Sequence, residues 1–96
     1  MRVSNSCLEI RCGSGVWTSL FIEKFPNVTV LDISEEMLTQ TKNKFDKKIK
    51  EYLCGDFLDD NLIFKDGYDH IFLIRAFEYF NNKEDTVKKL FEIKLR

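Results

Sequence analysis

This sequence is poor in the residues and patterns that mark metal centres, disulfide frameworks and membrane spans. His70 is the one histidine, and the three cysteines, Cys7, Cys12 and Cys54, lack the Cys-x-x-Cys spacing of zinc sites. We therefore expect neither a multi-histidine metal site nor a disulfide framework, and a reducing, cytoplasmic environment fits best. The N-terminus lacks the apolar core of a signal peptide, and no apolar run approaches the length that spans a membrane.

An excess of charge of either sign is also absent. Lysine and arginine number 15 against 16 aspartates and glutamates, so the formal net charge is -1. This balance offers no electrostatic footprint for nucleic acid or an anionic membrane, and we expect neither as a partner. The lysines between residues 42 and 50 fall at the end of a predicted helix, where cations complement the helix dipole. With 96 residues, of which 44% are hydrophobic, the chain predicts one small domain over residues 1–96.

Apolar periodicity predicts strands that alternate with helices. Continuous apolar or β-branched runs predict strands at residues 6–10, 28–33, 52–54 and 69–74. Helical spacing follows the first strand up to Phe25, the second strand from the N-cap Ser34 onward, and the fourth strand from Asn81 or Asn82 onward. Residues 57–67 show no clean period and predict a loop. This order predicts an α/β fold, a Rossmann-like parallel sheet flanked by helices.

Each predicted helix carries an apolar stripe that we expect to face the sheet. In the first helix the stripe consists of Val16, Trp17, Leu20, Phe21 and Phe25. In the second helix it consists of Met37, Thr41, Phe45 and Ile49. In the third helix it consists of Val87, Leu90, Phe91 and Leu95. These side chains are the predicted helical half of the core.

A glycine-rich turn joins the first predicted strand to the helix that follows it. Its sequence from residue 9 to residue 15 is Glu-Ile-Arg-Cys-Gly-Ser-Gly. Such a turn lets a ligand approach bare backbone and the unpaired N–H groups at the start of the helix. The dinucleotide fingerprint requires a third glycine at position 18, where Thr18 stands instead. A Gly-x-Gly turn alone is a weak signal, and a tight turn without a ligand is the alternative.

Two aspartates follow the next two predicted strands and make a ligand site more specific. Asp32 ends the second strand, where its carboxylate can accept both hydroxyls of a ribose. A helix-capping role for Asp32 is the alternative, but Ser34 is better placed for it. Asp56 follows the third strand, where a carboxylate and the neighbouring backbone amide can read an adenine edge while Ile33 packs on its face. Nicotinamide-binding domains do not generally need this second acidic residue.

Taken together, several segments resemble the motifs of class I S-adenosylmethionine-dependent methyltransferases. The similar segments are residues 8–15, 31–38, 55–57, 62–69 and 77–80. The ribose-side segment, Leu-Asp-Ile-Ser-Glu-Glu-Met-Leu at residues 31–38, is especially similar. Ile63 replaces a proline of the family pattern, and Tyr79 stands where relatives often have histidine. The resemblance covers nearly the whole chain and is closest to the small-molecule methyltransferases.

The resemblance implies S-adenosylmethionine binding. The implied cofactor-binding residues are Glu9, Gly13, Gly15, Asp32, Ile33, Asp56, Phe57 and Arg75. Gly13 and Gly15 would leave room for the methionine portion, and Asp32 would hold the ribose. Asp56 with Phe57 would hold the adenine.

The methionine end of the implied site involves charged residues of both signs. Glu9 would orient the loop or reach the amino group of the cofactor, and Arg75 would face the methionine end from the end of the fourth strand. For Arg75, a surface ion pair with Glu78 is the alternative. Arg11 stands where the family has its first glycine, and it would either crowd the methionine carboxylate or pair with it.

The implied reaction is methyl transfer from the sulfonium to an O, N, S or C nucleophile, with a small molecule as acceptor. Such an enzyme mainly supplies alignment and excludes water. Glu78, Tyr79 and His70 are candidates for contact with the acceptor, and a structural role is the alternative for each. We assign no catalytic residue from the sequence.

Length is the largest departure from the family. Relatives usually carry a helix before the first strand and three more strands after the last helix predicted here, and those elements close much of the acceptor pocket. We therefore expect a cofactor-binding portion truncated after the fourth strand and its helix. That strand would be an open edge for self-association or a partner. The alternatives are a degenerate, non-catalytic nucleotide- or partner-binding module, or another nucleotide-binding Rossmann-like domain, which Thr18 and Asp56 disfavour.

Overall fold

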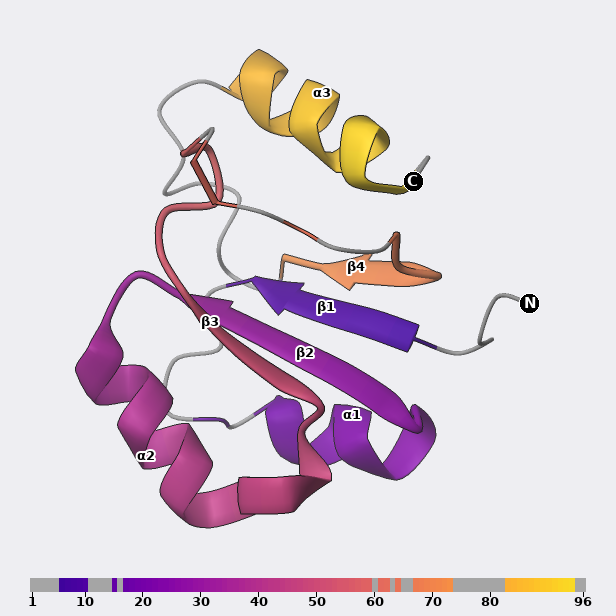
Figure 1. Ribbon diagram of the computed structural model, residues 1–96. Coiled ribbons are helices and arrows are strands. Elements are labelled where there is room, and N and C mark those ends of the chain that lie inside the picture. Colours follow the sequence, from indigo (N-terminus) through magenta and orange to yellow (C-terminus); the bar gives the residue numbers. More distant parts are fainter. Residues whose placement is uncertain are drawn as a thin grey trace.

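The computed structural model describes residues 6–10, 15, 17–59, 61, 62, 64, 67–73 and 83–94. Strands and helices alternate along these residues (Figure 1). The strands are β1 (Ser6–Ile10), β2 (Asn27–Asp32), β3 (Glu51–Cys54) and β4 (His70–Phe72). The helices are α1 (Thr18–Lys24), α2 (Glu35–Phe45), the 3-10 helix η1 (Asp46–Lys48) and α3 (Lys83–Lys94). Within these ranges no helix combines the length and the apolar character needed to cross a membrane.

The strands form one parallel sheet in the order β3-β2-β1-β4. From β1 the chain proceeds outward to β2 and β3, and β4 then lies on the other side of β1. Helices α1 and α2 lie on one face of the sheet and α3 lies on the other (Figure 1). The predicted α/β fold, a Rossmann-like parallel sheet flanked by helices, is therefore confirmed. In such sheets ligands bind at the carboxyl ends of the strands where the strand order reverses.

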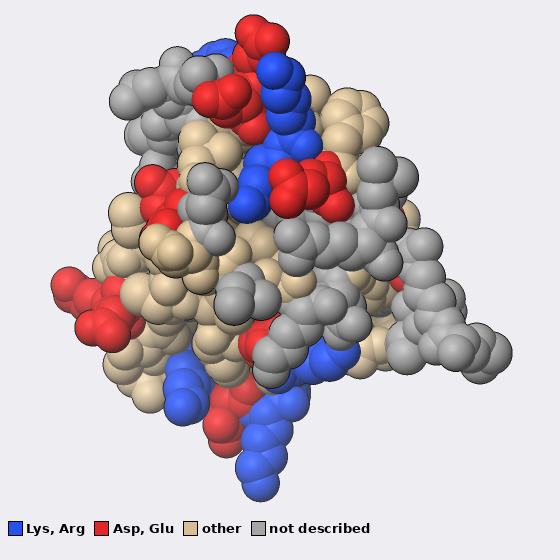
Figure 2. Space-filling model, turned by 45° about the horizontal axis from the view of Figure 1, so that its top comes forward, with Lys and Arg blue, Asp and Glu red and all other residues tan. Residues whose placement is uncertain are grey.

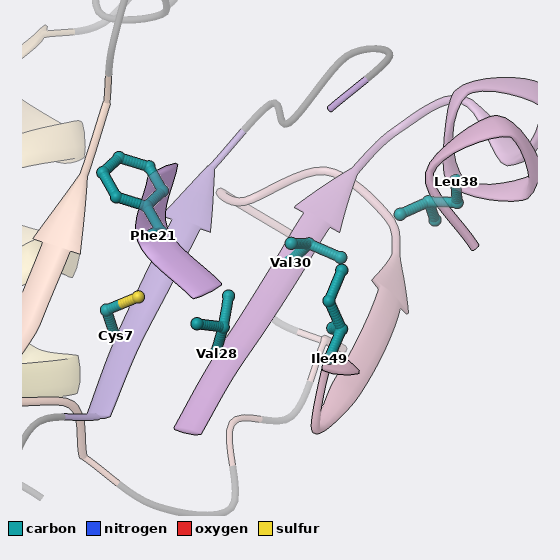
Figure 3. Packing of buried hydrophobic residues seen from close by; sticks show 6 residues of the cluster. All are labelled: Cys7, Phe21, Val28, Val30, Leu38 and Ile49. Atoms are coloured by element: carbon teal, nitrogen blue, oxygen red, sulfur yellow. The ribbon is translucent and has the colours of Figure 1, made fainter. Parts of the chain in front are cut away.

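Each face of the sheet has its own hydrophobic cluster. The cluster beneath α1 and α2 consists of Cys7, Phe21, Val28, Val30, Leu38 and Ile49 (Figure 3). The cluster on the α3 face consists of Leu8, Ile10, Leu31, Phe57, Phe64 and Tyr68. Consecutive residues of β1 and β2 belong to opposite clusters because side chains alternate across a strand. The two central strands therefore contribute to both halves of the core.

The predicted inner faces of α1 and α2 are partly wrong. In α1 Phe21 is buried, whereas Trp17, just before the helix, and Leu20 are exposed. In α2 Thr41 is buried as predicted, Phe45 and the following Ile49 pack on the core as predicted, and Met37 is exposed while its neighbour Leu38 is buried. Neighbouring residues of a helix lie about 100° apart, so a small rotation of the helix about its axis decides which of two adjacent residues, such as Met37 and Leu38, faces the sheet. Packing against the sheet decides this rotation.

The predicted inner face of the third helix is also partly wrong. Thr86 is fully buried and Leu90 is partly buried, whereas Val87 and Phe91 are exposed. Leu90 faces the core as predicted, and Thr86, one turn earlier on the same stripe, is buried in place of the predicted Val87 and Phe91. Leu95, also predicted to be buried, lies outside the described residues. The helix therefore presents apolar side chains to solvent.

The predicted loop over residues 57–67 contributes more to the core than its sequence indicates. Phe57 and Phe64 are buried, with ring centroids 6.0 Å apart, and Phe64 packs edge-on against Tyr68 at 6.4 Å.

Beyond the loop, β4 is shorter than predicted. Asp69 precedes it and ties it to β1, because the Ser6 amide donates to Asp69 Oδ2 at 3.1 Å. Aromatic packing therefore holds the loop over residues 57–67, and the Ser6–Asp69 hydrogen bond holds the start of β4.

Candidate functional site

The carboxyl ends of the three strands from β1 to β3 lie side by side at one edge of the sheet. In the register, Glu9 pairs with Val30 on β2, and Asp32 pairs with Cys54 on β3. Asp56 follows β3 at the same edge, where the Gly55 amide donates to the Asp32 carbonyl at 3.0 Å. Adjacent strands are about 4.8 Å apart. The structure therefore brings together the three acidic residues that the sequence analysis selected.

Glu9 is a buried carboxyl group at the end of β1, with 3% of its surface exposed. The Thr18 hydroxyl, at the start of α1, donates a hydrogen bond to Glu9 Oε1. The pKa of Glu9 is raised to about 7, mainly by burial and further by the negative charge of Asp32, while the Thr18 hydrogen bond opposes this rise. Near neutral pH this group can therefore hold a proton or, once ionised, attract a cation.

Asp32 is the last residue of β2 and is also buried, with 6% of its surface exposed. Its Oδ1 accepts from the Ser34 amide at 3.0 Å. Ser34 is the N-cap of α2, because its Oγ accepts from the Met37 amide at 3.3 Å. The predicted N-cap is confirmed, and the hydrogen bond from the Ser34 amide fixes the Asp32 carboxylate next to the N-terminus of α2. Between them Ile33 is 64% exposed, so an apolar side chain stands in solvent beside the Asp32 carboxylate.

Asp56 and Phe57 contribute to this edge in different ways. Asp56 is exposed, and its Oδ1 accepts from the Leu58 amide at 3.0 Å. A carboxylate can accept further hydrogen bonds through its remaining lone pairs. The Phe57 ring is 2% exposed and belongs to the hydrophobic cluster on the α3 face. The Phe57 side chain therefore belongs to the core, and the predicted contact of the Phe57 backbone amide with adenine stays a prediction.

Gly15 is needed for a reason that the sequence did not reveal. Its φ is +90°, a conformation that residues with a side chain rarely adopt. A Cβ at this position would lie 2.8 Å from Phe45 Cε2 and 3.5 Å from Thr41 Oγ1, both on α2. The glycine thus lets the turn pack against α2. Its predicted contact with the methionine portion stays a prediction.

Several predicted positions lie outside the described residues, namely Arg11, Gly13, Arg75, Glu78 and Tyr79. His70 is described and stands apart from the acidic edge. It is the first residue of β4, pairs in register with Cys7, and packs its ring against Phe25 at 5.1 Å. The structure therefore supports the structural alternative for His70.

Charge on the surface is mixed in sign. On the face shown in Figure 2, acidic and basic side chains are interspersed. Within α3, Lys88 Nζ lies 3.4 Å from Glu84 Oε1. The described side chains on this face therefore form no broad basic surface of the kind that binds a phosphate backbone.

Comparison with known protein families shows which family this chain belongs to. The sequence model of a family described as "Methyltransferase domain" matches residues 7–93. This chain belongs to that family. The resemblance to class I S-adenosylmethionine-dependent methyltransferases, inferred above from the motifs, is thereby confirmed.

Individual members of the family share this part of the fold. Malonyl-(acyl-carrier protein) O-methyltransferase of Priestia megaterium is 36% identical over 87 residues, covering 88% of this chain and 31% of that protein. The crystal structure of an S-adenosylmethionine-dependent methyltransferase from Clostridium acetobutylicum has a TM-score of 0.73 at 32% identity, covering 96% of this chain and 37% of that one. The plantazolicin methyltransferase BamL, solved in complex with a triazolic desmethylPZN analog and SAH, has a TM-score of 0.77 at 24% identity, covering 96% of this chain and 35% of that one. The chain spans about a third of the length of these methyltransferases.

Thr18 is the residue of this site that the sequence analysis missed. It was noticed only because it excludes the dinucleotide fingerprint. The structure shows that it is fully buried and bonded to Glu9. A hydroxyl-bearing residue at the first turn of the helix, after a strand whose second-last residue is acidic, is the signal that could have indicated the contact.

Proposed function

We propose that this chain binds S-adenosylmethionine at the carboxyl edge of the sheet, as the cofactor-binding portion of a methyltransferase. One observation supports this most directly. Glu9 and Asp32 are buried carboxylates at the ends of adjacent strands, with Asp56 after the third strand at the same edge. Family membership supports the same cofactor, and titrating the chain with it is the test.

The groups at this edge fit the chemistry of the proposed cofactor. Asp32 would accept the ribose hydroxyls, and ionised Glu9 would attract the cationic methionine end. Asp56 and the Phe57 backbone would contact the adenine edge, and the exposed side chain of Ile33 would pack on its face. Gly13, Gly15 and Arg75 keep the roles implied by the resemblance, at the methionine end.

The bound cofactor would supply a methyl group that is already activated by its sulfonium. The protein would contribute alignment and exclusion of water, and alignment can contribute up to about 10 kcal/mol to lowering a barrier. We propose a small-molecule acceptor. The name of the Priestia megaterium relative, which refers to a carrier-bound malonyl group, supports this class.

We further propose that the β4 edge and the outer face of α3 are covered in the functional protein. Among the described residues the sheet ends at β4, so one side of this strand has no partner strand there. A groove of about 300 Å³ runs between β4 and α3 and is lined by Ile71, Val87, Leu90 and Phe91. Unpaired strand edges and apolar patches favour association. For the 96-residue chain we propose self-association through this surface, and a separate partner is the other outcome of the test.

Calorimetric titration with S-adenosylmethionine, its demethylated product and NAD tests the cofactor proposal. We expect the first two ligands to bind and NAD to bind more weakly. Asp32→Ala should weaken binding by about 1–3 kcal/mol, the scale of a charge-assisted hydrogen bond. Glu23→Ala, which removes an exposed carboxylate from α1, is the matched control and should leave the affinity unchanged.

Tighter binding of NAD would contradict the proposal and favour another nucleotide-binding Rossmann-like domain. Binding of S-adenosylmethionine without turnover on any acceptor would favour the degenerate, non-catalytic module.

A further inference from the structure

Thr18 connects the two elements that flank the glycine turn. It is the first residue of α1 and is fully buried. Its hydroxyl donates to Glu9 Oε1, across a separation of 9 residues. The hydrogen bond therefore ties the end of β1 to the start of α1 and fixes one oxygen of the Glu9 carboxyl group.

The position of Thr18 in the turn makes this contact informative. In dinucleotide-binding turns a glycine at this position allows the helix to pack closely on the strand. Here a β-branched residue occupies the position, and its hydroxyl forms a polar link to the strand. A purely apolar residue of the same shape would fill the same space without this link.

The surroundings of Glu9 make the Thr18 hydroxyl important for its charge. Asp32 from β2 disfavours the ionised form, as does burial, whereas the Thr18 hydrogen bond favours it. Cys7 lies two residues back on β1, and burial together with Glu9 raises the pKa of its thiol to about 12, so it stays neutral. Phe72 is the register partner of Glu9 on β4 and carries no charge. Among these neighbours only Thr18 stabilises the ionised form of the Glu9 carboxyl group.

We propose that Thr18 is a positioning residue whose hydroxyl holds the Glu9 carboxylate ionised and oriented toward the cationic end of the bound cofactor. This inference rests on the proposed cofactor. It predicts that affinity rises with pH as Glu9 loses its proton. The α-amino group of the ligand titrates at about pH 8, so measurements stay at or below about pH 7.5.

The expected size of the effect follows from the titration of one group. If only ionised Glu9 attracts the ligand, a pKa of about 7 gives an affinity increase of roughly 20-fold between about pH 5.5 and about pH 7.5. Thr18→Val keeps the shape but removes the hydroxyl. If the lost hydrogen bond raises the pKa of Glu9 by about one unit, the affinity near pH 7.5 falls about threefold.

The experiment measures S-adenosylmethionine affinity against pH for the full chain and three variants. Thr18→Val should shift the midpoint of the pH profile of affinity toward higher pH. Thr18→Ser should keep the profile of the unaltered chain, and Glu9→Gln should make the affinity independent of pH. Thermal unfolding of each variant identifies any general loss of stability. The ¹³C NMR titration of the Glu9 carboxyl in the ligand-free chain measures the hydrogen bond without any cofactor.

The two measurements separate the two proposals. Absence of S-adenosylmethionine binding by the unaltered chain at every pH would reject the proposed function, and with it the positioning role. If the ligand binds but Thr18→Val leaves both the Glu9 titration and the affinity profile unchanged, the role of Thr18 is rejected alone. An equal shift in Thr18→Val and Thr18→Ser would likewise reject the hydroxyl as its cause.

Discussion

Strand β2 is buried from Val28 to Asp32, whereas the apolar residues of β4 are only half-buried and α3 leaves Val87 and Phe91 exposed. The difference follows from their places in the sheet. Each side of β2 has a partner strand, and both of its faces are packed. Among the described residues β4 has a partner on one side, and Phe91 above it is 66% exposed. The proposed cofactor edge is therefore supported by the well-packed centre of the sheet, and the apolar groove lies on its less covered side.

The substitution with the largest expected effect tests whether the central strands of the sheet contribute most to the stability of the chain. Leu31→Ala removes a fully buried side chain from β2 and should destabilise the chain by about 2–5 kcal/mol. Phe91→Ala removes a larger but exposed side chain from α3 and should cost about 1 kcal/mol or less. Urea unfolding measures both changes. Equal losses would contradict the comparison and would mean that the α3 side is packed in solution.

The glycine turn sharpens the comparison at the site itself. Gly15→Ala should destabilise the chain by about 1–3 kcal/mol, because its backbone has a positive φ and the new Cβ would clash with the Phe45 ring. Gly55→Ala is the matched control. There the nearest atom to an added Cβ is Leu62 Cδ1 at 3.3 Å, the end of a flexible side chain.

We expect Gly55→Ala to change the free energy of unfolding less than Gly15→Ala does. The reverse order, measured by thermal or urea unfolding, would show that the packing of the turn against α2 contributes little.

A substitution on the outer face of α3 should change stability least but should reduce self-association of the chain. Phe91→Lys places a charge on the outer face of α3 and should change the free energy of unfolding by about 0.5 kcal/mol or less. It should also shift the sedimentation of the chain toward the monomer, because a lysine opposes burial of the β4–α3 groove. Leu20→Lys is the control, since it replaces an exposed apolar residue on α1. Monomeric sedimentation of the unaltered chain at all concentrations would refute self-association.

Much of the architecture was predictable because its signals are local. Period, strand composition and the order of elements indicated the parallel sheet, and the serine before two glutamates indicated the start of α2 at Ser34. Asp32 and Asp56 were selected because Asp32 ends a strand and Asp56 follows the next one, and the carboxyl ends of parallel strands meet at one edge. These inferences need only the positions of residues along the chain.

What the sequence by itself determined is thus the α/β order, the acidic edge and the family. The tertiary structure alone decided the exact rotation of each helix, which buries Leu38 in place of Met37 and Thr86 in place of Val87. It likewise decided that the Phe57 ring turns into the core and that Thr18 meets Glu9. Such contacts depend on how a helix or loop crosses the sheet, and this is set by the packing of residues distant in sequence.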